Sequence, residues 1–134
     1  MVDAAIDESK LSGKPLLVEF VGSDWCPWCI KLHEEVFSQP EFQRWAIQTV
    51  VLLTVDFPTF RVQSNELRHQ NAALAKKYDI PGYPTVLFLD PDGHEWQIRL
   101  HGRRCKAARW IADEVGTAPT QLGERFETTA TSTS

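Results

Sequence analysis

Short runs of strand-forming apolar residues alternate with helical patterns along the chain, and this alternation limits the folds that it can adopt. The runs at residues 16–21, 49–55 and 85–89 are rich in Val, Leu, Phe and Thr, which is typical of strands in a sheet. We expect the first two to be buried strands. Apolar residues at helical spacing lie in five segments: 2–11, 27–36, 40–46, 64–78 and 107–115. Strands that alternate with helices predict an α/β domain.

Local signals indicate where several of these elements begin or end. Ser38-Gln39-Pro40-Glu41 has the pattern of a capping box with proline in the first helical turn. Ser64 or Asn65 is expected to cap the next helix. Asp90-Pro91-Asp92-Gly93 predicts the tight turn of a hairpin. Apolar and polar residues then alternate over 96–100, which predicts a returning strand near the edge of the sheet.

Chain length and charge set the size of the domain and exclude one class of partner. A chain of 134 residues with 43% apolar content can bury a core without disulfides or metals. We expect one domain over residues 1–116 and a flexible tail over 117–134, where large apolar residues are few. Lys and Arg number 14 against 18 Asp and Glu, so the formal net charge is −4. This balance excludes a globally basic nucleic-acid binder. We also expect the chain to be a monomer.

No sequence segment suggests a membrane span or an export signal. Apolar runs are interrupted by Glu19 and Asp56 well before the roughly 18 residues that a transmembrane helix needs. Asp3, Asp7 and Glu8 stand where a secretory signal would begin with basic residues. We therefore expect no membrane span and no signal peptide in this chain, although a processed form with a new initiator Met would look the same.

Two of the three cysteines form the motif Cys26-Pro27-Trp28-Cys29 at the junction of a predicted strand and a predicted helix. A thiolate at a helix start is favoured by unpaired backbone N–H groups and by the positive end of the helix dipole. Two intervening residues place the second sulfur one turn further on, where it can attack a mixed disulfide formed by the first. The spacing predicts that Cys26 attacks a substrate disulfide and that Cys29 resolves the intermediate.

Three features together resemble the thioredoxin superfamily across residues 3–116: Glu19 in a buried strand, the segment Trp25-Cys26-Pro27-Trp28-Cys29, and Ile80-Pro81-Gly82-Tyr83-Pro84-Thr85 ahead of a hairpin. The surroundings of the cysteine motif are similar to bacterial thioredoxin-like proteins of the thiol-disulfide interchange type, many of which are exported. The resemblance implies a thioredoxin fold, with a central mixed β-sheet and helices on both faces. It favours an exported or periplasmic location if a signal peptide has been removed, and a cytoplasmic one otherwise.

The resemblance also implies roles for individual residues. Pro84 would follow a cis peptide bond beside the cysteine pair, and the Tyr83 backbone would pair with an extended segment of a protein substrate. Glu19 matches the buried acid that accepts the proton of the resolving thiol, with one extra residue in the intervening loop. Trp25 matches the aromatic flank of the motif. The implied enzyme is a protein disulfide oxidoreductase without a bound cofactor, which receives electrons from a redox partner protein.

Some residues admit a second interpretation. Trp28 and Pro27 lie where a substrate would dock, but Trp28 is equally suited to packing on Tyr83. Glu19 could instead pair with a basic side chain. Cys105, which has no neighbouring cysteine in sequence, is best explained as a half-buried thiol on the last helix.

A metal-binding or chaperone-like module is the alternative to an enzyme. Cys26 and Cys29 form half of a zinc site, and His33 lies one helical turn further along. A closed zinc site needs four ligands, and no second tight pair is present in the sequence. A solvent-facing helical histidine is the simpler interpretation of His33. For the enzyme, the sequence leaves open whether it acts as reductase, oxidase or isomerase, because Pro27-Trp28 does not set a known potential.

Overall fold

A computed structural model describes the backbone of residues 2–101 and the side chains of residues 2–95. The predicted last helix, Cys105 and the tail over 117–134 lie outside the described residues. Among the helices of the described part, none is long and apolar enough to cross a membrane.

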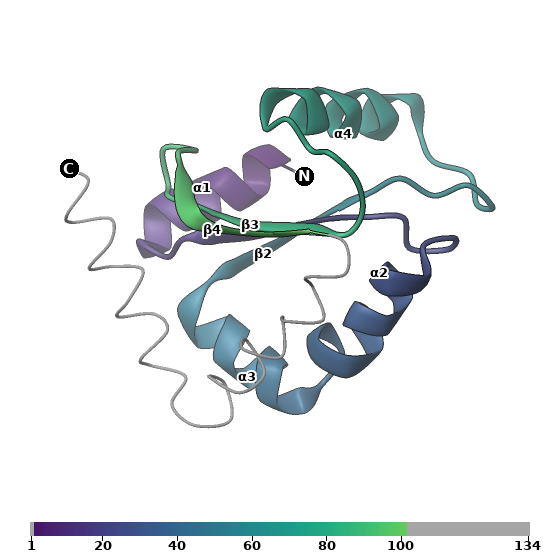
Figure 1. Ribbon diagram of the computed structural model, residues 1–134. Coiled ribbons are helices and arrows are strands. Elements are labelled where there is room, and N and C mark those ends of the chain that lie inside the picture. Colours follow the sequence, from purple (N-terminus) through teal and green to yellow (C-terminus); the bar gives the residue numbers. More distant parts are fainter. Residues whose placement is uncertain (1, 102–134) are drawn as a thin grey trace.

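A four-stranded mixed sheet forms the centre of the fold, as Figure 1 shows. The elements follow the chain in the order α1 (Val2–Ser12), β1 (Leu16–Val21), α2 (Pro27–Leu32), the π-helical segment η1 (His33–Phe37), α3 (Pro40–Thr49), β2 (Val51–Asp56), α4 (Asn65–Lys77), β3 (Thr85–Leu89) and β4 (Glu95–His101). The strand order is β2-β1-β3-β4, so β4 lies at an edge, as predicted. Strand β1 pairs with β2 in parallel and with β3 antiparallel, and β3 and β4 form the predicted hairpin.

Helices cover both faces of the sheet, which confirms the predicted layers. Helices α1 and α4 lie on one face, and α2 and α3 lie on the other (Figure 1). On the first face, alternate residues of β1 and β2 form a buried core with side chains of α1 and α4. The members of this core include Leu16, Val18, Phe20, Val51, Leu53 and Val55 from the strands, with Ala5 from α1. On the second face, the residues predicted to share the helix stripe of 27–36 are buried: Cys29, Leu32 and Val36.

Strand β2 corrects the prediction of a strand buried on both sides. It starts at Val51, because Thr49 is the last residue of α3. Its burial alternates, and Leu52 is 45% exposed while Thr54 is also exposed. As an edge strand, β2 packs only its Val51, Leu53 and Val55 side into the core shared with α1. Its other side is therefore available to line a site.

The predicted capping box at Ser38 is wrong. The residue before the first turn of α3 is Gln39, which makes no side-chain cap, while Pro40 occupies the first turn as expected. The Ser38 hydroxyl instead donates to the carbonyl of Glu34, because Ser38 ends the preceding π-helical segment. The Ser64 prediction is confirmed, since its side chain accepts a hydrogen bond from the Leu67 N–H at 3.2 Å.

Candidate active site

The cysteine motif begins helix α2 directly after a tight turn from β1. The Cys26 N–H donates to the carbonyl of Gly22 at 2.9 Å, which closes the turn. Gly22 is needed there because a Cβ at this position would lie 2.2 Å from the Trp25 ring. Cys26 then caps α2, with Pro27 in the first turn, where its missing N–H costs little. The Cys29 N–H donates to the Cys26 sulfur at 3.3 Å.

Both cysteines are free thiols, and both are almost fully buried. They form a small apolar cluster with Val21, and Trp28 and Tyr83 pack against it. The Cys29 sulfur also accepts a hydrogen bond from the Gly22 N–H, with a donor–acceptor distance of 3.5 Å. The two sulfurs therefore lie in a dry setting in which backbone N–H groups are the nearby donors. Such donors stabilise sulfur in its anionic form.

The loop before β3 packs against the cysteines, as the sequence predicted. The Tyr83–Pro84 peptide bond is cis, and Pro84 is buried. The Tyr83 ring stands edge-on to Trp25, with 5.8 Å between the centroids, and lies 5.2 Å from the Phe57 ring. Partial burial raises the pKa of the Tyr83 hydroxyl above its usual value, and the neighbouring Cys29 sulfur raises it by a smaller amount. Trp25, Phe57 and Tyr83 thus form an aromatic rim beside the motif.

Trp28 and Pro27 occupy different environments in the motif. Pro27 is exposed at the first position of α2. Trp28 is half-buried against the cysteine cluster, and the Lys31 ammonium lies 5.6 Å from its ring centroid. Trp28 therefore combines a packed side with an accessible one, so both of the roles considered for it from the sequence agree with its position.

Sequence reasoning missed a set of contacts that fastens residues 57–63 to the cysteine turn. The Asp24 carboxylate accepts the N–H groups of Thr59 and Phe60 at 2.9 and 2.8 Å. The hydrogen bonds from these two N–H groups hold the pKa of the Asp24 carboxyl below its usual value, and the one from Thr59 has the larger effect. Trp25 Nε1 donates to the Phe57 carbonyl at 2.7 Å.

A second anchor lies at the end of β2. The Asp56 carboxylate accepts both the N–H and the hydroxyl of Ser23 and forms an ion pair with Arg61. These contacts hold the segment after β2 against the turn that carries the cysteines. In the sequence, the signal for a fastened loop is Asp24, which stands directly before Trp25 and Cys26. An Asp carboxylate readily accepts backbone N–H groups of a loop.

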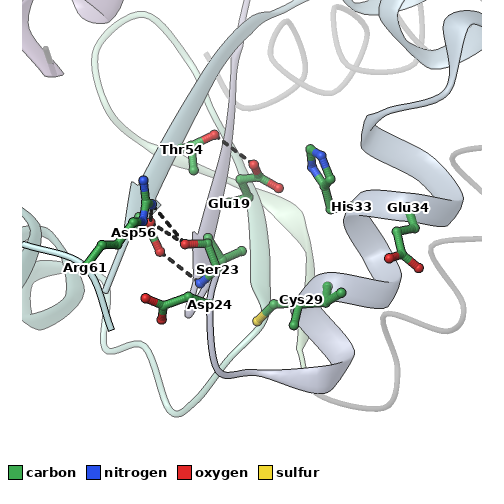
Figure 2. A pocket seen from close by; sticks show the side chains of 11 residues that line it. Glu19, Ser23, Asp24, Cys29, His33, Glu34, Thr54, Asp56 and Arg61 are labelled. Carbon is green, nitrogen blue, oxygen red and sulfur yellow. Dashed lines mark hydrogen bonds and ion pairs between the residues drawn. The ribbon is translucent and has the colours of Figure 1, made fainter. Parts of the chain in front are cut away.

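A pocket of about 480 Å³ opens next to the cysteines, between β1, β2 and α2 (Figure 2). Its lining comprises Glu19, Val21, Ser23, Asp24, Cys29, Ile30, His33, Glu34, Thr54, Asp56 and Arg61. Glu19 of β1 is paired in register with Thr54 of β2, and the Thr54 hydroxyl donates to the Glu19 carboxylate at 2.7 Å. The predicted acid, the Cys29 side chain and His33 therefore face one cavity.

Burial dominates the electrostatics of Glu19. It raises the pKa of the Glu19 carboxyl above its usual value, against the hydrogen bond from Thr54 and the nearby His33, which lower it. Asp56 adds a smaller effect in the raising direction. No basic side chain forms a salt bridge with Glu19 among the described residues. A carboxyl in this environment is suited to holding and releasing a proton.

We expect a Glu19→Gln variant to be more stable than the parent at high pH and equally stable at low pH. A carboxyl whose pKa is raised by folding binds its proton more tightly in the folded state, so stability falls as the pH rises from the unfolded pKa through the folded one. Gln keeps an acceptor for Thr54 but has no charge to bury. Urea midpoints should coincide below about pH 4 and separate progressively above it. Equal midpoints at all pH values, or the same separation in the exposed α1 variant Glu8→Gln, would contradict the burial of this charge.

The geometry does not support a metal site at the cysteines. Within the described residues, one group of three acidic, His or Cys side chains brings its ligand atoms within 4.8 Å of one another, namely Asp90, Asp92 and His94 in the exposed hairpin turn. Cys26, Cys29 and His33 do not form such a group. His33 is exposed, in agreement with the simpler interpretation of a solvent-facing histidine. It also lines the pocket.

The chain is similar to curated proteins that act on disulfides. Residues 2–112 match a family model described as a thioredoxin-like domain. The disulfide bond reductase DsbH of Chlamydia pneumoniae is 36% identical over 91 residues, which are 68% of this chain and 55% of that protein. The thiol:disulfide interchange protein DsbD 1 of Pseudomonas aeruginosa is 30% identical over 105 residues, which are 75% of this chain and 16% of that protein. The chain thus spans little more than half of the first relative and less than a fifth of the second.

Solved structures show the same architecture. A structure of DsbH oxidoreductase matches with a TM-score of 0.68 and 35% identity, over 72% of this chain and 67% of the other. The reduced C-terminal domain of DsbD from Neisseria meningitidis matches with a TM-score of 0.55 and 28% identity, over 75% of this chain and 81% of the other. The sheet and its flanking helices are therefore shared with proteins of thiol-disulfide exchange.

Proposed function

Because the chain belongs to the thioredoxin-like family and has the thioredoxin fold, we propose that it is a thiol-disulfide oxidoreductase that acts through Cys26 and Cys29. The observation that supports this most is the hydrogen bond from the Cys29 N–H to the Cys26 sulfur at the first turn of α2. The donor stabilises the charge that a Cys26 thiolate carries. The positive end of the α2 helix dipole adds to this stabilisation. Because the Cys29 sulfur also accepts a backbone N–H, from Gly22, the assignment of Cys26 as the attacking group rests on its place at the cap of α2.

The proposed reaction has two exchange steps. The Cys26 thiolate attacks one sulfur of a substrate disulfide, and the other sulfur leaves as a thiolate. Cys29 then loses its proton and attacks the Cys26 sulfur, which releases the second substrate sulfur and closes the Cys26–Cys29 bond. Glu19 lines the same cavity as Cys29 and is the group that accepts this proton. Two electrons pass from the chain to the substrate, and a partner dithiol protein restores them.

Substrate binding is proposed for the surface around the motif. The Tyr83 backbone, set beside the cysteines by the loop at Pro84, would pair with an extended substrate segment. Trp25 is 41% exposed, and Pro27 is exposed, so both present apolar surface to that segment. Trp28 contributes its accessible side. Backbone pairing next to apolar contacts suits protein substrates of varied sequence.

The reductase direction is the one we propose, because the relative DsbH is named a disulfide bond reductase. The reduction potential of the pair tests the function and its direction together. Equilibration with glutathione or dithiothreitol buffers should give a two-electron transition at about −200 mV or below, in the range of reducing thioredoxin-like proteins. A potential near about −120 mV would indicate an oxidant. No two-electron transition at all would contradict thiol-disulfide exchange.

A further inference from the structure

We propose that His33 carries protons between solvent and the Glu19 carboxyl while the cysteine pair cycles. The inference deepens the proposed function and rests on it. It assigns a role to a side chain that the two exchange steps do not use. It also identifies the cavity beside Cys29 as the route by which the proton of the resolving thiol leaves the protein.

The position of His33 is the first support. Glu19, Cys29 and His33 line one pocket, and Figure 2 shows the His33 ring and the Glu19 carboxyl pointing into the same space. Glu19 is half-buried, whereas His33 is exposed. His33 therefore touches both the interior of the pocket and the solvent, as a proton carrier must.

The local backbone explains how a helical histidine reaches this place. His33 begins the π-helical segment η1, and its carbonyl accepts the N–H of Ser38 at 2.8 Å, five residues further on. Val36 and Phe37 of this segment are buried. Wider π-helical turns change which side chains share a face, and they are frequent at functional sites. The His33 N–H itself donates to the carbonyls of Cys29 and Ile30, so helical spacing places His33 one turn beyond Cys29, and the wider turn begins only after it.

The other charged groups of the pocket are less suited to this task. Asp56 is held by Ser23 and Arg61, and Arg61 is in turn the ion-pair partner of Asp56. Asp24 accepts two backbone N–H groups, and the pKa of its carboxyl is lowered. Glu34 also lines the pocket and is exposed, so its carboxylate is the rival carrier that an experiment must separate from His33.

Electrostatic interaction with His33 reaches the Glu19 carboxyl. His33 lowers the pKa of Glu19, while burial raises it. The charge on one group therefore influences proton binding by the other, which a shared proton requires. Histidine is the side chain whose ordinary proton exchange falls nearest to neutral pH.

The proton follows a balanced route during substrate reduction. The Cys29 thiol gives its proton to the Glu19 carboxylate as its sulfur bonds to the Cys26 sulfur, and the Cys26–substrate bond breaks. The substrate leaves as a thiolate with both electrons of the broken bond and takes a proton from water. Within this same step, His33 accepts the proton of the Glu19 carboxyl and releases it to solvent, so loss of His33 slows the resolution itself. Glu19 is again a carboxylate, ready for the next resolving step.

The test uses Ellman's reagent on a Cys105→Ser background, in which Cys26 and Cys29 are the two thiols of the chain. The two thiolates that the reagent releases then report the two exchange steps separately. The first thiolate appears when Cys26 attacks, and the second when Cys29 resolves the mixed disulfide. In stopped flow, a His33→Gln variant should keep the first phase and slow the second at least about tenfold near neutral pH. Added imidazole should restore the second phase. His69→Gln, on α4 across the sheet, is the control and should retain the parent rates. Glu34→Gln is the comparison that separates the rival carrier in the same pocket from His33.

Each contrary result has a definite meaning. An unchanged second phase in His33→Gln, or a slowing that imidazole does not restore, would overturn the carrier role. Full recovery in His33→Lys would also overturn it, because lysine supplies charge near Glu19 but exchanges protons poorly at neutral pH. A slow second phase in Glu34→Gln alone would assign the route to Glu34 instead. Absence of both phases in the parent protein would reject the proposed function itself.

Discussion

A Cys26→Ser variant is expected to lose disulfide reduction by at least about a thousandfold, as for other enzymes whose nucleophile is removed. Serine matches the shape of cysteine and can keep the hydrogen bond from the Cys29 N–H, so the fold and the start of α2 should remain intact. Its hydroxyl is not ionised at neutral pH, however, and oxygen cannot form the mixed disulfide. The rate of insulin reduction with dithiothreitol as electron donor measures the loss.

The matched control for this variant is Cys105→Ser. Cys105 is expected to be a structural thiol outside the redox pair, so its replacement should leave the rate at the parent level. Unchanged circular dichroism of Cys26→Ser would show that the loss is chemical. Substantial activity of Cys26→Ser, or loss of activity in Cys105→Ser alone, would place the reactive thiol elsewhere.

A Cys29→Ser variant is expected to accumulate a covalent complex with its substrate. Cys26 can still attack, because its sulfur keeps the backbone N–H of residue 29 as a donor. The resolving sulfur is missing, so the mixed disulfide on Cys26 is not broken by a thiol of the motif itself. Catalytic turnover should fall at least about a hundredfold, while the complex persists for longer than the assay.

Intact-mass measurement under non-reducing conditions detects this complex. With two identical peptides joined by one disulfide, the expected mass is that of the variant plus one peptide less two hydrogens, and a reductant should remove the adduct. The double variant Cys26→Ser, Cys29→Ser is the control and should give no adduct. An adduct that survives in the double variant would show that Cys105 or a noncovalent contact is responsible.

The sequence predicted those parts of the fold that rest on local patterns. The strand at 16–21 and the third strand at 85–89 were located to the residue, because short, mostly apolar runs end at turn residues on both sides. The helix start at Pro27 followed from the change to helical spacing at Cys29, Leu32 and Val36. Local signals of this kind depend on a few neighbouring residues.

Predictions failed where the deciding partner is distant in the chain or where two local patterns compete. Ser38 has the residues of a helix cap, but the preceding π-helical segment uses it first. Strand β2 has a continuous apolar run, yet its position at the sheet edge leaves Leu52 exposed. Neither outcome can be obtained from the residues of the segment alone, since both depend on what lies next to it in space.

The candidate site shows the same division. The cysteine motif and Pro84 were identified from residues that stand together in the sequence. The fastening of Thr59 and Phe60 to Asp24 joins segments that are 35 and 36 residues apart. The pocket that His33 lines is formed together with residues of the opposite strands, such as Glu19 and Thr54. Helical spacing correctly predicted that His33 is exposed, but it did not predict the cavity that His33 lines.

In the proposed reaction, reduction of a substrate disulfide leaves Cys26 bonded to Cys29, and a single turnover shows whether this bond forms. The reduced protein is mixed with one equivalent of a disulfide substrate, remaining thiols are alkylated, and the peptides are mapped by mass spectrometry. We predict a peptide in which Cys26 is bonded to Cys29, with Cys105 alkylated. Alkylated Cys26 and Cys29 after complete substrate reduction, or a disulfide that includes Cys105, would contradict the claim.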